Sequence, residues 1–385
     1  MAGNEANTTF ETKMPGSIRI TETLVSASLS CAVSSRFGFT RETIMPQTRM
    51  KFNRRRLIGA GAAVVASAGA SSLLAPTTTR ADNAPQASAA LPNGSGFYRF
   101  KIDDFQATVI SDGYGTIPIG PIFAPNASES DLAATLKANF MQAMVQGTSN
   151  VLVVDTGRER ILVDSGWGEK LGNAFGKFAQ LDANLRRAGI SPDSIDLVVI
   201  SHAHLDHIGG LTKAGAAAFP KATVVFVDKE WSYWTGNQFE SDVMRSSMPD
   251  PFKQGTIGAA KEQLPPVANR VHGVKQDGEI VPGVHFVSAP GHSPAHAAIL
   301  FSSGSDQFMY LADVAHHPVT SLQHPEWKPV FDYDPELSIK TRKSFLDRAA
   351  TDRLTVMAYH FPFPAIGHVV KQQQAFRWEP VQWTW

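Results

Sequence analysis

Short runs of β-branched and aliphatic residues recur along the chain from residue 97 onward, separated by polar segments rich in Gly, Pro, Asn and Ser. Runs of this length and composition predict strands that are buried on one or both faces. Ten such strands are expected, at about 97–103, 105–111, 150–155, 160–164, 195–200, 222–227, 284–289, 296–302, 307–312 and 353–359. Thr156-Gly157 predicts a hairpin turn between the third and the fourth.

Helical periodicity alternates with these strands. The spacing of apolar residues predicts helices at about 129–146, 173–188, 211–218 and 335–350. The last begins with Asp334-Pro335-Glu336, where an Asp suited to an N-cap precedes a Pro at the first helical position. Because strands with interspersed helices occur twice along the chain, the pattern predicts an α/β fold of two packed sheets with helices outside.

The segment from 231 to 270 has little periodicity of either kind. Aromatic residues are interleaved there with Gly, Pro, Asn and Ser, at Trp231, Tyr233, Trp234, Phe239 and Phe252. One interpretation is a loop with a small hydrophobic cluster of its own. The other is a lid that faces a substrate, since long ordered loops in compact domains are often functional. Trp327 is a candidate for the same wall.

The segment Ser201-His202-Ala203-His204-Leu205-Asp206-His207 contains the densest group of metal-ligand side chains. It follows a predicted buried strand and precedes Gly209-Gly210, so it forms a loop at a strand end, where α/β proteins usually expose functional groups. Imidazole nitrogens and a carboxylate suit Zn²⁺ or a similar divalent metal. The segment therefore predicts a metal site rather than a polar surface loop.

Three further ligand-type residues stand in the same position relative to a strand. His292, Asp313 and His360 each follow a short apolar run, and all twelve His residues of the chain lie at or after position 202. We therefore expect the ends of several strands to converge on one site. His272 and His285 are interpreted as ordinary polar residues, whereas no role is assigned to His296, His316, His317 or His324.

The order and spacing of these motifs resemble those of the metallo-β-lactamase superfamily of binuclear metallohydrolases. The resemblance implies an αββα four-layer sandwich and two divalent ions, most readily Zn, with Mn, Co or Fe also compatible with N and O ligands. It implies that one ion is held by His202, His204 and His292, and the second by Asp206, His207 and His360, with Asp313 bridging. Asp164 matches the upstream Asp whose carboxylate supports the ligand loop.

A closer resemblance is to the methyl parathion hydrolase branch, from about Gly96 to the C-terminus. Trp234 and Phe252 fall where that branch places aromatic residues at the substrate mouth, and His368 lies near the mouth by the same comparison. The resemblance also implies a homodimer. With Trp327, these residues make up the predicted substrate pocket.

The expected activity is hydrolysis by a hydroxide that bridges two metal ions. Paired ions bring the pKa of a bound water towards neutrality, so no Ser or Cys nucleophile is required. Asp206 is the expected catalytic residue, because it can orient the hydroxide and pass its proton to the leaving group. The ligand segments carry no cluster of Lys or Arg, which favours a small neutral substrate such as an aryl phosphotriester or aryl ester.

Several alternatives are weighed on single residues. His204 argues against the oxygen-reducing di-iron relatives, which have Glu there, and Asp313 argues against class B β-lactamases. The strand-like tail argues against a relative of glyoxalase II, which ends in a helical domain. A lactonase acting on acyl-homoserine or aryl lactones remains open, since its metal site has the same ligands. So does a metal-binding protein without turnover.

The composition excludes one class of partner. The chain has 35 basic and 35 acidic residues, a formal net charge of +0, which argues against nucleic-acid binding and the nucleases of the superfamily. The single Cys, Cys31, lies in the N-terminal segment, so the remainder of the chain has neither disulfides nor thiolate ligands.

The N-terminal segment reads differently from the rest of the chain. Residues 1–49 are interpreted as a non-native or disordered extension that precedes the true start, Met50. Residues 50–81 resemble a twin-arginine signal peptide, 82–95 a linker, and 96–385 the hydrolase domain. A membrane anchor is the alternative, but the apolar run is mostly Ala, Gly and Ser. The expected location is therefore periplasmic or secreted, with no stable membrane span after cleavage.

Overall fold

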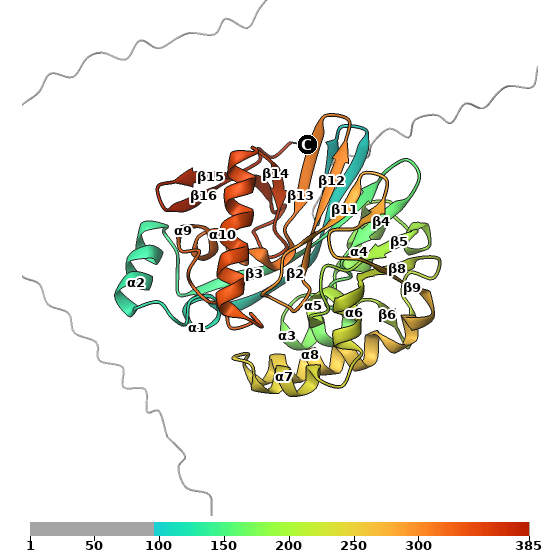
Figure 1. Cartoon of the computed structure of the whole chain (residues 1–385), viewed down its shortest axis with the longest axis horizontal. Helices are drawn as coiled ribbons and strands as arrows, with labels where there is room; N and C mark the ends of the chain where they lie inside the picture. The colour runs from blue at the N-terminus through green and yellow to red at the C-terminus, as the bar shows by residue number, and fades with distance from the viewer. Residues whose placement is uncertain (1–95, 385) are drawn as a thin grey trace, which may run out of the picture. The chain divides into compact units, whose positions relative to one another are not determined.

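The computed structural model describes residues 96–384, and the predicted extension, signal peptide and linker lie outside them. Two seven-stranded sheets form the framework (Figure 1). The first has the order β1 (Phe97–Ile102), β2 (Phe105–Pro118), β3 (Met144–Asp155), β4 (Arg160–Val163), β5 (Leu197–Val199), β8 (Thr223–Val227) and β9 (Val271–Val274). The second has the order β10 (Glu279–Val281), β11 (Val284–Ser288), β12 (Ala297–Ser303), β13 (Asp306–Tyr310), β14 (Thr355–Met357), β15 (Ile366–Gln372) and β16 (Ala375–Pro380).

Helices cover the outer faces of both sheets. α4 (Leu181–Arg187) packs against β1 and β2, α6 (Asp228–Trp234) against β8 and β9, and α10 (Pro335–Thr351) against β15 (Figure 1). Buried side chains of both sheets form one continuous core between them. The αββα four-layer sandwich expected from the sequence is therefore confirmed.

The remaining helices are short and lie mostly at the ends of strands. They are α1 (Ile119–Phe123), α2 (Glu129–Ala138), α3 (Gly168–Phe175), α5 (Leu205–Ile208), α7 (Phe239–Arg245), α8 (Asp250–Gln263) and α9 (Thr320–Gln323). The described residues also contain three 3₁₀ turns, η1 (Pro192–Ser194), η2 (Pro265–Arg270) and η3 (Ala312–Val314). None of the helices in residues 96–384 combines the length and the hydrophobicity that a membrane-spanning segment needs.

All ten predicted strands are present, because each combines β-branched residues with burial between the layers. β2 and β3 are longer than predicted, running together from Pro118 and Met144 in an antiparallel pair. The patterns of β9, β10, β15 and β16 are short or mixed, so the sequence did not predict them as strands, although the aromatic tail indicated an extended C-terminus. The hairpin turn at Thr156-Gly157 is present, and Gly157 has a φ of 83°.

Three helix predictions are corrected by the structure. The helix expected at 129–146 ends at Ala138, and Phe140 leaves it with a φ of 55°. The helix expected at 173–188 is divided into α3 and α4. The helix expected at 211–218 is wrong: β6 (Thr212–Lys213) and β7 (Ala216–Ala217) form a small hairpin there. Runs of Ala favour helix, but Gly215 with a φ of 79° makes a tight turn.

The segment from 231 to 270 is neither a loop nor a single lid. It contains most of α6 and all of α7 and α8. Trp234 and Phe239 are buried in the main core, with their ring centroids 5.6 Å apart. The interleaved Gly and Pro residues that hid the helical pattern stand mostly at the ends of these short helices.

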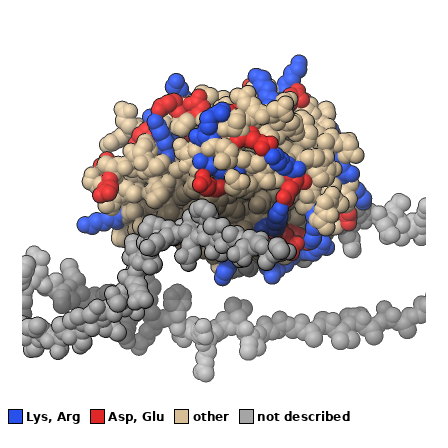
Figure 2. All heavy atoms as spheres, turned by 90° about the horizontal axis from the view of Figure 1, so that it is seen from below, with Lys and Arg blue, Asp and Glu red and all other residues tan. Residues whose placement is uncertain are grey.

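Charged side chains are mixed on the surface. On the face visible in Figure 2, Lys and Arg lie next to Asp and Glu, in agreement with the balanced composition. This face shows no continuous basic surface for a polyanion.

The start of α10 has the predicted cap. The side chain of Asp334 accepts a hydrogen bond from the backbone N–H of Leu337 at 3.0 Å, with Pro335 at the first helical position. This bond satisfies one of the N–H groups that a helix leaves without a partner. We expect Asp334→Ala to lower the free energy of unfolding by about 1 kcal/mol in denaturant melts. Lys343→Ala, exposed on the same helix, serves as the matched control and should change it by less than about 0.5 kcal/mol.

Candidate metal centre

The predicted ligands lie at one edge of the two sheets because each follows the carboxyl end of a strand. His202, His204, Asp206 and His207 follow β5 in the first sheet, the last two within α5. His292, Asp313 and His360 follow β11, β13 and β14 of the second sheet. β13 and β14 are parallel, so their ends meet at the same edge, and the two sheets bring both groups together.

Asp313 lies at the centre of the cluster. Its Oδ1 is 3.4 Å from Nε2 of His207. Its Oδ2 is 3.3 Å from Nε2 of both His292 and His360, and 3.9 Å from Nε2 of His202. One carboxylate therefore faces imidazoles from both halves of the ligand set, as a bridging ligand requires.

The other ligands separate into two groups. The ligand atoms of His202, His204 and His292 lie within 4.8 Å of one another, as do those of Asp206, His207 and His360. His204 Nδ1 is 2.9 Å from His292 Nε2, and Asp206 Oδ2 is 3.3 Å from His360 Nε2. Two adjacent triads with a shared carboxylate match the arrangement that holds two divalent ions.

Unpartnered buried atoms show that the residues fit metal ions. His202 Nε2, His207 Nε2 and Asp313 Oδ1 are buried and have no hydrogen-bond partner among the described residues. Such atoms are costly to bury without a partner. Coordination of an ion between them would supply that partner, and imidazole with carboxylate is a donor set that Zn²⁺ accepts.

The electrostatics of the cluster depend on its burial. Burial, together with neighbouring imidazoles, holds the pKa of His202 and His204 well below the ordinary value, so their nitrogen lone pairs are free. Burial also lowers the pKa of His207, but the carboxylates of Asp313 and Asp164 outweigh it and raise that pKa well above the ordinary value. Binding of metal therefore requires proton release and becomes pH-dependent.

Asp164 lies behind His207, in the supporting position that the sequence predicts. Its Oδ2 is 2.8 Å from His207 Nδ1 and accepts hydrogen bonds from Tyr310 Oη at 2.7 Å and Ser201 Oγ at 2.8 Å. The backbone N–H of Ser201 donates to Oδ1 at 2.8 Å. These bonds fix the ring so that Nε2 of His207 faces the cluster.

Asp332 is an equivalent support that sequence reasoning missed. Its Oδ1 is 2.9 Å from Nδ1 of His292, and the buried Arg342 donates to its Oδ2 at 3.1 Å. Arg342 also donates to the carbonyls of Val314, Pro325 and Trp327. Asp332 lies 40 residues from its histidine, between predicted elements, and only its place just before the capped helix distinguishes it in the sequence.

A cavity of about 70 Å³, open to solvent, lies over the cluster. Its floor includes Asp206, His292, Asp313 and His360. Its walls are largely aromatic, with Phe123, Trp167, Phe175, Phe178, Phe252 and Phe331. Among the described residues that line it, none is Lys, Arg or Glu, so the cavity fits an uncharged apolar molecule.

Of the four predicted pocket residues, the structure places one in the cavity wall. Phe252 lines it, with its ring 4.7 Å from that of Phe175. Trp234 does not: its indole N–H donates to Glu230 at 2.7 Å beneath His204. Glu230 also accepts from the backbone N–H of Ala295 at 2.9 Å, so Trp234 braces the ligand loops from behind.

Trp327 and His368 also lie outside the cavity lining. Trp327 stacks on His324 with ring centroids 3.8 Å apart. His368 is exposed on β15 and pairs with Thr355, at the start of β14, whereas His360 follows the end of that strand. The aromatic and His-rich composition that singled them out carries no information on which edge of the sheet they reach.

Two adjacent histidines without an assigned role do line the cavity. His316 has Nε2 3.4 Å from Asp313 Oδ2, and neither ring nitrogen has a hydrogen-bond partner among the described residues. Its ring stacks on that of His360, with the ring centroids 5.7 Å apart. His317 follows it along the wall. Their position shortly after Asp313, which follows β13, is the signal in the sequence that marks them.

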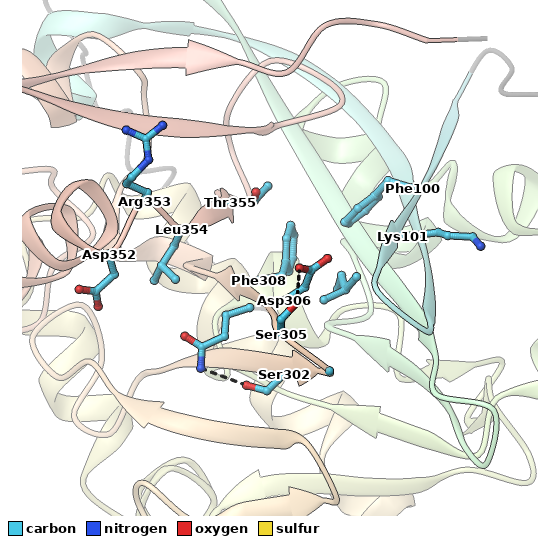
Figure 3. Close-up of a pocket in the computed structure, with 13 residues that line it drawn as sticks. Phe100, Lys101, Ser302, Ser305, Asp306, Phe308, Asp352, Arg353, Leu354 and Thr355 are labelled. Atoms are coloured by element: carbon cyan, nitrogen blue, oxygen red, sulfur yellow. Dashed lines mark hydrogen bonds between the residues drawn. The ribbon is translucent and has the colours of Figure 1, made fainter.

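A second hollow lies at the opposite edge of the second sheet (Figure 3). Lys101, Asp306 and Arg353 are among its lining residues, from β1, β13 and the turn before β14. Asp306 and Thr355 begin the strands whose other ends lead to the metal cluster. None of the predicted metal ligands lines this hollow.

Comparison with known proteins agrees with this geometry. Residues 144–360 match the family model described as the metallo-beta-lactamase superfamily, which is more than half of the 385 residues. The chain belongs to this superfamily. The match begins at β3 and ends at His360, the last predicted ligand.

Known relatives include lactonases. The chain is 24% identical over 193 residues to an N-acyl homoserine lactonase of Bacillus thuringiensis, covering 50% of this chain and 63% of the relative. It is 22% identical over 190 residues to one of Bacillus cereus, covering 49% and 62%. The chain therefore spans less than two thirds of the length of these curated relatives.

Two solved structures extend the likeness over more of the chain. One is AidC, a dizinc quorum-quenching lactonase in complex with a product, with 26% identity, a TM-score of 0.67 and coverage of 75% of this chain and 98% of that one. The other is the hydrolase AbOPH of the beta lactamase superfamily, with 25% identity, a TM-score of 0.68 and coverage of 76% and 100%.

Loss of the shared carboxylate tests the cluster as a metal centre. We expect Asp313→Ala to retain one ion or fewer per chain and to lose nearly all hydrolytic turnover, since the two triads then share no carboxylate. Metal content is measured by elemental analysis after dialysis, with a thermal melt to check folding. Asp306→Ala, an exposed residue of β13, is the control. Two ions retained by the variant would show that the bridge is misassigned.

The pairing of Asp332 makes a pH-dependent contribution to stability. Burial alone would raise its pKa, but hydrogen bonding to His292 and the charge of Arg342 lower the pKa to about 2. A depressed pKa stabilises the fold above the ordinary value near 3.8 and loses this contribution as the pH falls towards 2. In metal-free protein, the difference in unfolding free energy between the wild type and Asp332→Asn should shrink by about 2 kcal/mol from pH 6 downward. Asp306→Asn should show no such trend.

Proposed function

We propose that this protein is a binuclear metal-dependent hydrolase that opens the ester bond of N-acylated lactones. The observation that carries the proposal is the cluster of seven ligand-type residues at the floor of an uncharged, aromatic cavity. The likeness to a dizinc lactonase over 75% of the chain supports the same reaction class. The lactone ring is an ester that presents one carbonyl to the cluster and an acyl chain to the walls.

The ligand assignment follows the two triads. His202, His204 and His292 would hold one ion and Asp206, His207 and His360 the other, with Asp313 shared between them. Zn²⁺ is the first choice. When bound, such a pair supplies a water of lowered pKa as nucleophile and polarises the carbonyl oxygen under attack.

Residues of the chain would orient the attacking water and the substrate carbonyl. Asp206 faces the cavity, and its backbone carbonyl accepts a hydrogen bond from Tyr359 Oη at 2.7 Å, which fixes the start of α5. Its carboxylate is placed to take a proton from the attacking water and pass it to the leaving alkoxide. His316, unpartnered and 3.4 Å from Asp313, is placed to donate to the reacting carbonyl oxygen.

The cavity walls favour neutral substrates. Apart from the ligands, the described lining consists of aromatic and aliphatic side chains, two histidines whose pKa burial lowers to about 4, and a few hydroxyl and amide groups. A phosphate monoester would lack any cation here other than the metal ions. An acyl chain or aryl group gains free energy from burial against the same walls.

Aryl phosphotriesters and aryl esters are the second candidate substrates. They are neutral, they need the same two ions, and the resemblance to methyl parathion hydrolases extends from Gly96 to the C-terminus. Similarity to the hydrolase AbOPH over 76% of the chain is compatible with either substrate. Export by the twin-arginine route and dimerisation are further parts of the proposal, supported by the N-terminal sequence and by the family resemblance respectively.

Substrate preference separates the two candidates. We expect the zinc-loaded protein to hydrolyse N-hexanoyl-homoserine lactone with a kcat/KM at least about tenfold above that for dimethyl p-nitrophenyl phosphate or p-nitrophenyl hexanoate. Chelation should reduce turnover by at least about 100-fold, and added Zn²⁺ should restore it. Rates are measured by proton release for the lactone and by p-nitrophenol absorbance for the others.

The control is the Asp313→Ala variant, which should not regain activity with Zn²⁺. Preference for the phosphotriester would move the proposal to the second candidate. Turnover that is unaffected by chelation would contradict a metal mechanism altogether.

A further inference from the structure

His317 differs from the other histidines of the cavity because its own backbone turn holds the ring. Nδ1 accepts hydrogen bonds from the backbone N–H of Val319 at 3.2 Å and of Thr320 at 3.4 Å. The backbone of His317 is fixed as well, since its N–H donates to Ser321 Oγ and its carbonyl accepts from the N–H of Ser321. The ring therefore has one orientation at the start of α9.

These bonds decide the tautomer. A backbone N–H can only donate, so Nδ1 of His317 must be an acceptor and carries no proton. In neutral imidazole the proton then lies on Nε2. Burial lowers the pKa of His317 to about 4, which keeps the ring neutral near pH 7. His317 is thus a fixed N–H donor rather than a cation.

Among residues 96–384 the donor has no hydrogen-bond partner. None of the hydrogen bonds found among residues 96–384 uses Nε2 of His317, and the residue is 9% exposed in the cavity wall. Its Nδ1 edge faces the turn of Val319 and Thr320, so Nε2 is directed away from that turn. The ring stacks on that of Phe123, with the ring centroids 6.2 Å apart, and Phe123 also lines the cavity.

Two other polar groups of the wall are already used, whereas Thr256 Oγ1 has no hydrogen-bond partner among the described residues. Thr148 Oγ1 donates to the carbonyl of Phe361 at 2.8 Å, and Ser149 Oγ accepts from the indole N–H of Trp167 at 2.9 Å. His316 lies against the metal ligands. His317 therefore offers a hydrogen-bond donor beside the reaction centre and outside the ligand set.

We propose that His317 determines substrate specificity by donating its Nε2–H to a second acceptor oxygen of the substrate, of the amide carbonyl type, next to the bond that is cleaved. The inference rests on the proposed hydrolase function but not on the lactone ring itself. A neutral N–H that faces the cavity discriminates between substrates with and without an acceptor, because only a substrate with an acceptor can form this hydrogen bond. N-acylated lactones have such a carbonyl, and plain alkyl lactones lack it.

Two substitutions separate the donor from the structural role of the ring. In His317→Asn the side-chain oxygen can take the place of Nδ1 and accept from the turn, but no group reaches the position of Nε2. In His317→Gln the amide N–H₂ reaches the position of Nε2 and keeps the donor. His272→Asn, an exposed histidine on β9, is the matched control.

The readout is the ratio of kcat/KM for N-hexanoyl-homoserine lactone to that for a γ-alkyl lactone of equal length. We expect His317→Asn to lower this ratio about fivefold, mainly through KM, since one hydrogen bond contributes roughly 1 kcal/mol. His317→Gln should recover at least half of the loss on a logarithmic scale, and His272→Asn should leave the ratio unchanged. Zinc content should be equal in all variants.

The corresponding ratio of kcat/KM is that for the p-nitrophenyl ester of N-butanoylglycine to that for p-nitrophenyl hexanoate. Neither ester contains a lactone ring. A wild type that hydrolyses these esters but neither lactone would contradict the proposed lactonase function and still test His317. An unchanged ratio in His317→Asn in both series would overturn the specificity role. An equal loss of kcat/KM for both substrates of a pair would also overturn it, because it would show that His317 only supports the structure.

Discussion

The carboxylate of Asp313 is the group around which the site is organised. It is 3% exposed and faces Nε2 atoms of His207, His292, His316 and His360 within 3.4 Å. Burial alone would raise its pKa, but these imidazoles hold that pKa well below the ordinary value, so the carboxylate remains an anion in the core. An unpaired buried charge is strongly destabilising, and only convergence of several strand ends on one point provides enough partners.

The orientation of the imidazoles is enforced from outside the cluster. Asp164 is paired with His207, Asp332 with His292, and the carbonyl of Thr148 with His360, each 2.8 to 2.9 Å from Nδ1. Each support comes from a different part of the chain. The two carboxylates are themselves supported differently, since hydroxyl groups surround Asp164 and the guanidinium of Arg342 neutralises Asp332. The second triad therefore has a more negative environment than the first.

The sequence predicts the features that depend only on residues adjacent in the chain. A local pattern is enough to predict the ligand loop after β5, the ligands that follow strands (His292, Asp313 and His360) and the N-cap at Asp334. The helices between 231 and 270 are missed because Pro at their ends and Gly255 and Gly258 inside α8 hide the helical periodicity. Asp332 and the Nε2–H of His317 are missed because their roles arise from contacts that only the folded backbone defines.

The sheets make unequal contributions to the ligand set. The first sheet provides His202, His204, Asp206 and His207, and the second provides His292, Asp313 and His360. Each triad thus draws ligands from both halves of the sandwich. Ions bound there would act as cross-links across the interface between the sheets, comparable in topology to a pair of disulfides in a chain with a single cysteine. Metal supply would then control the cohesion of the fold as well as its chemistry.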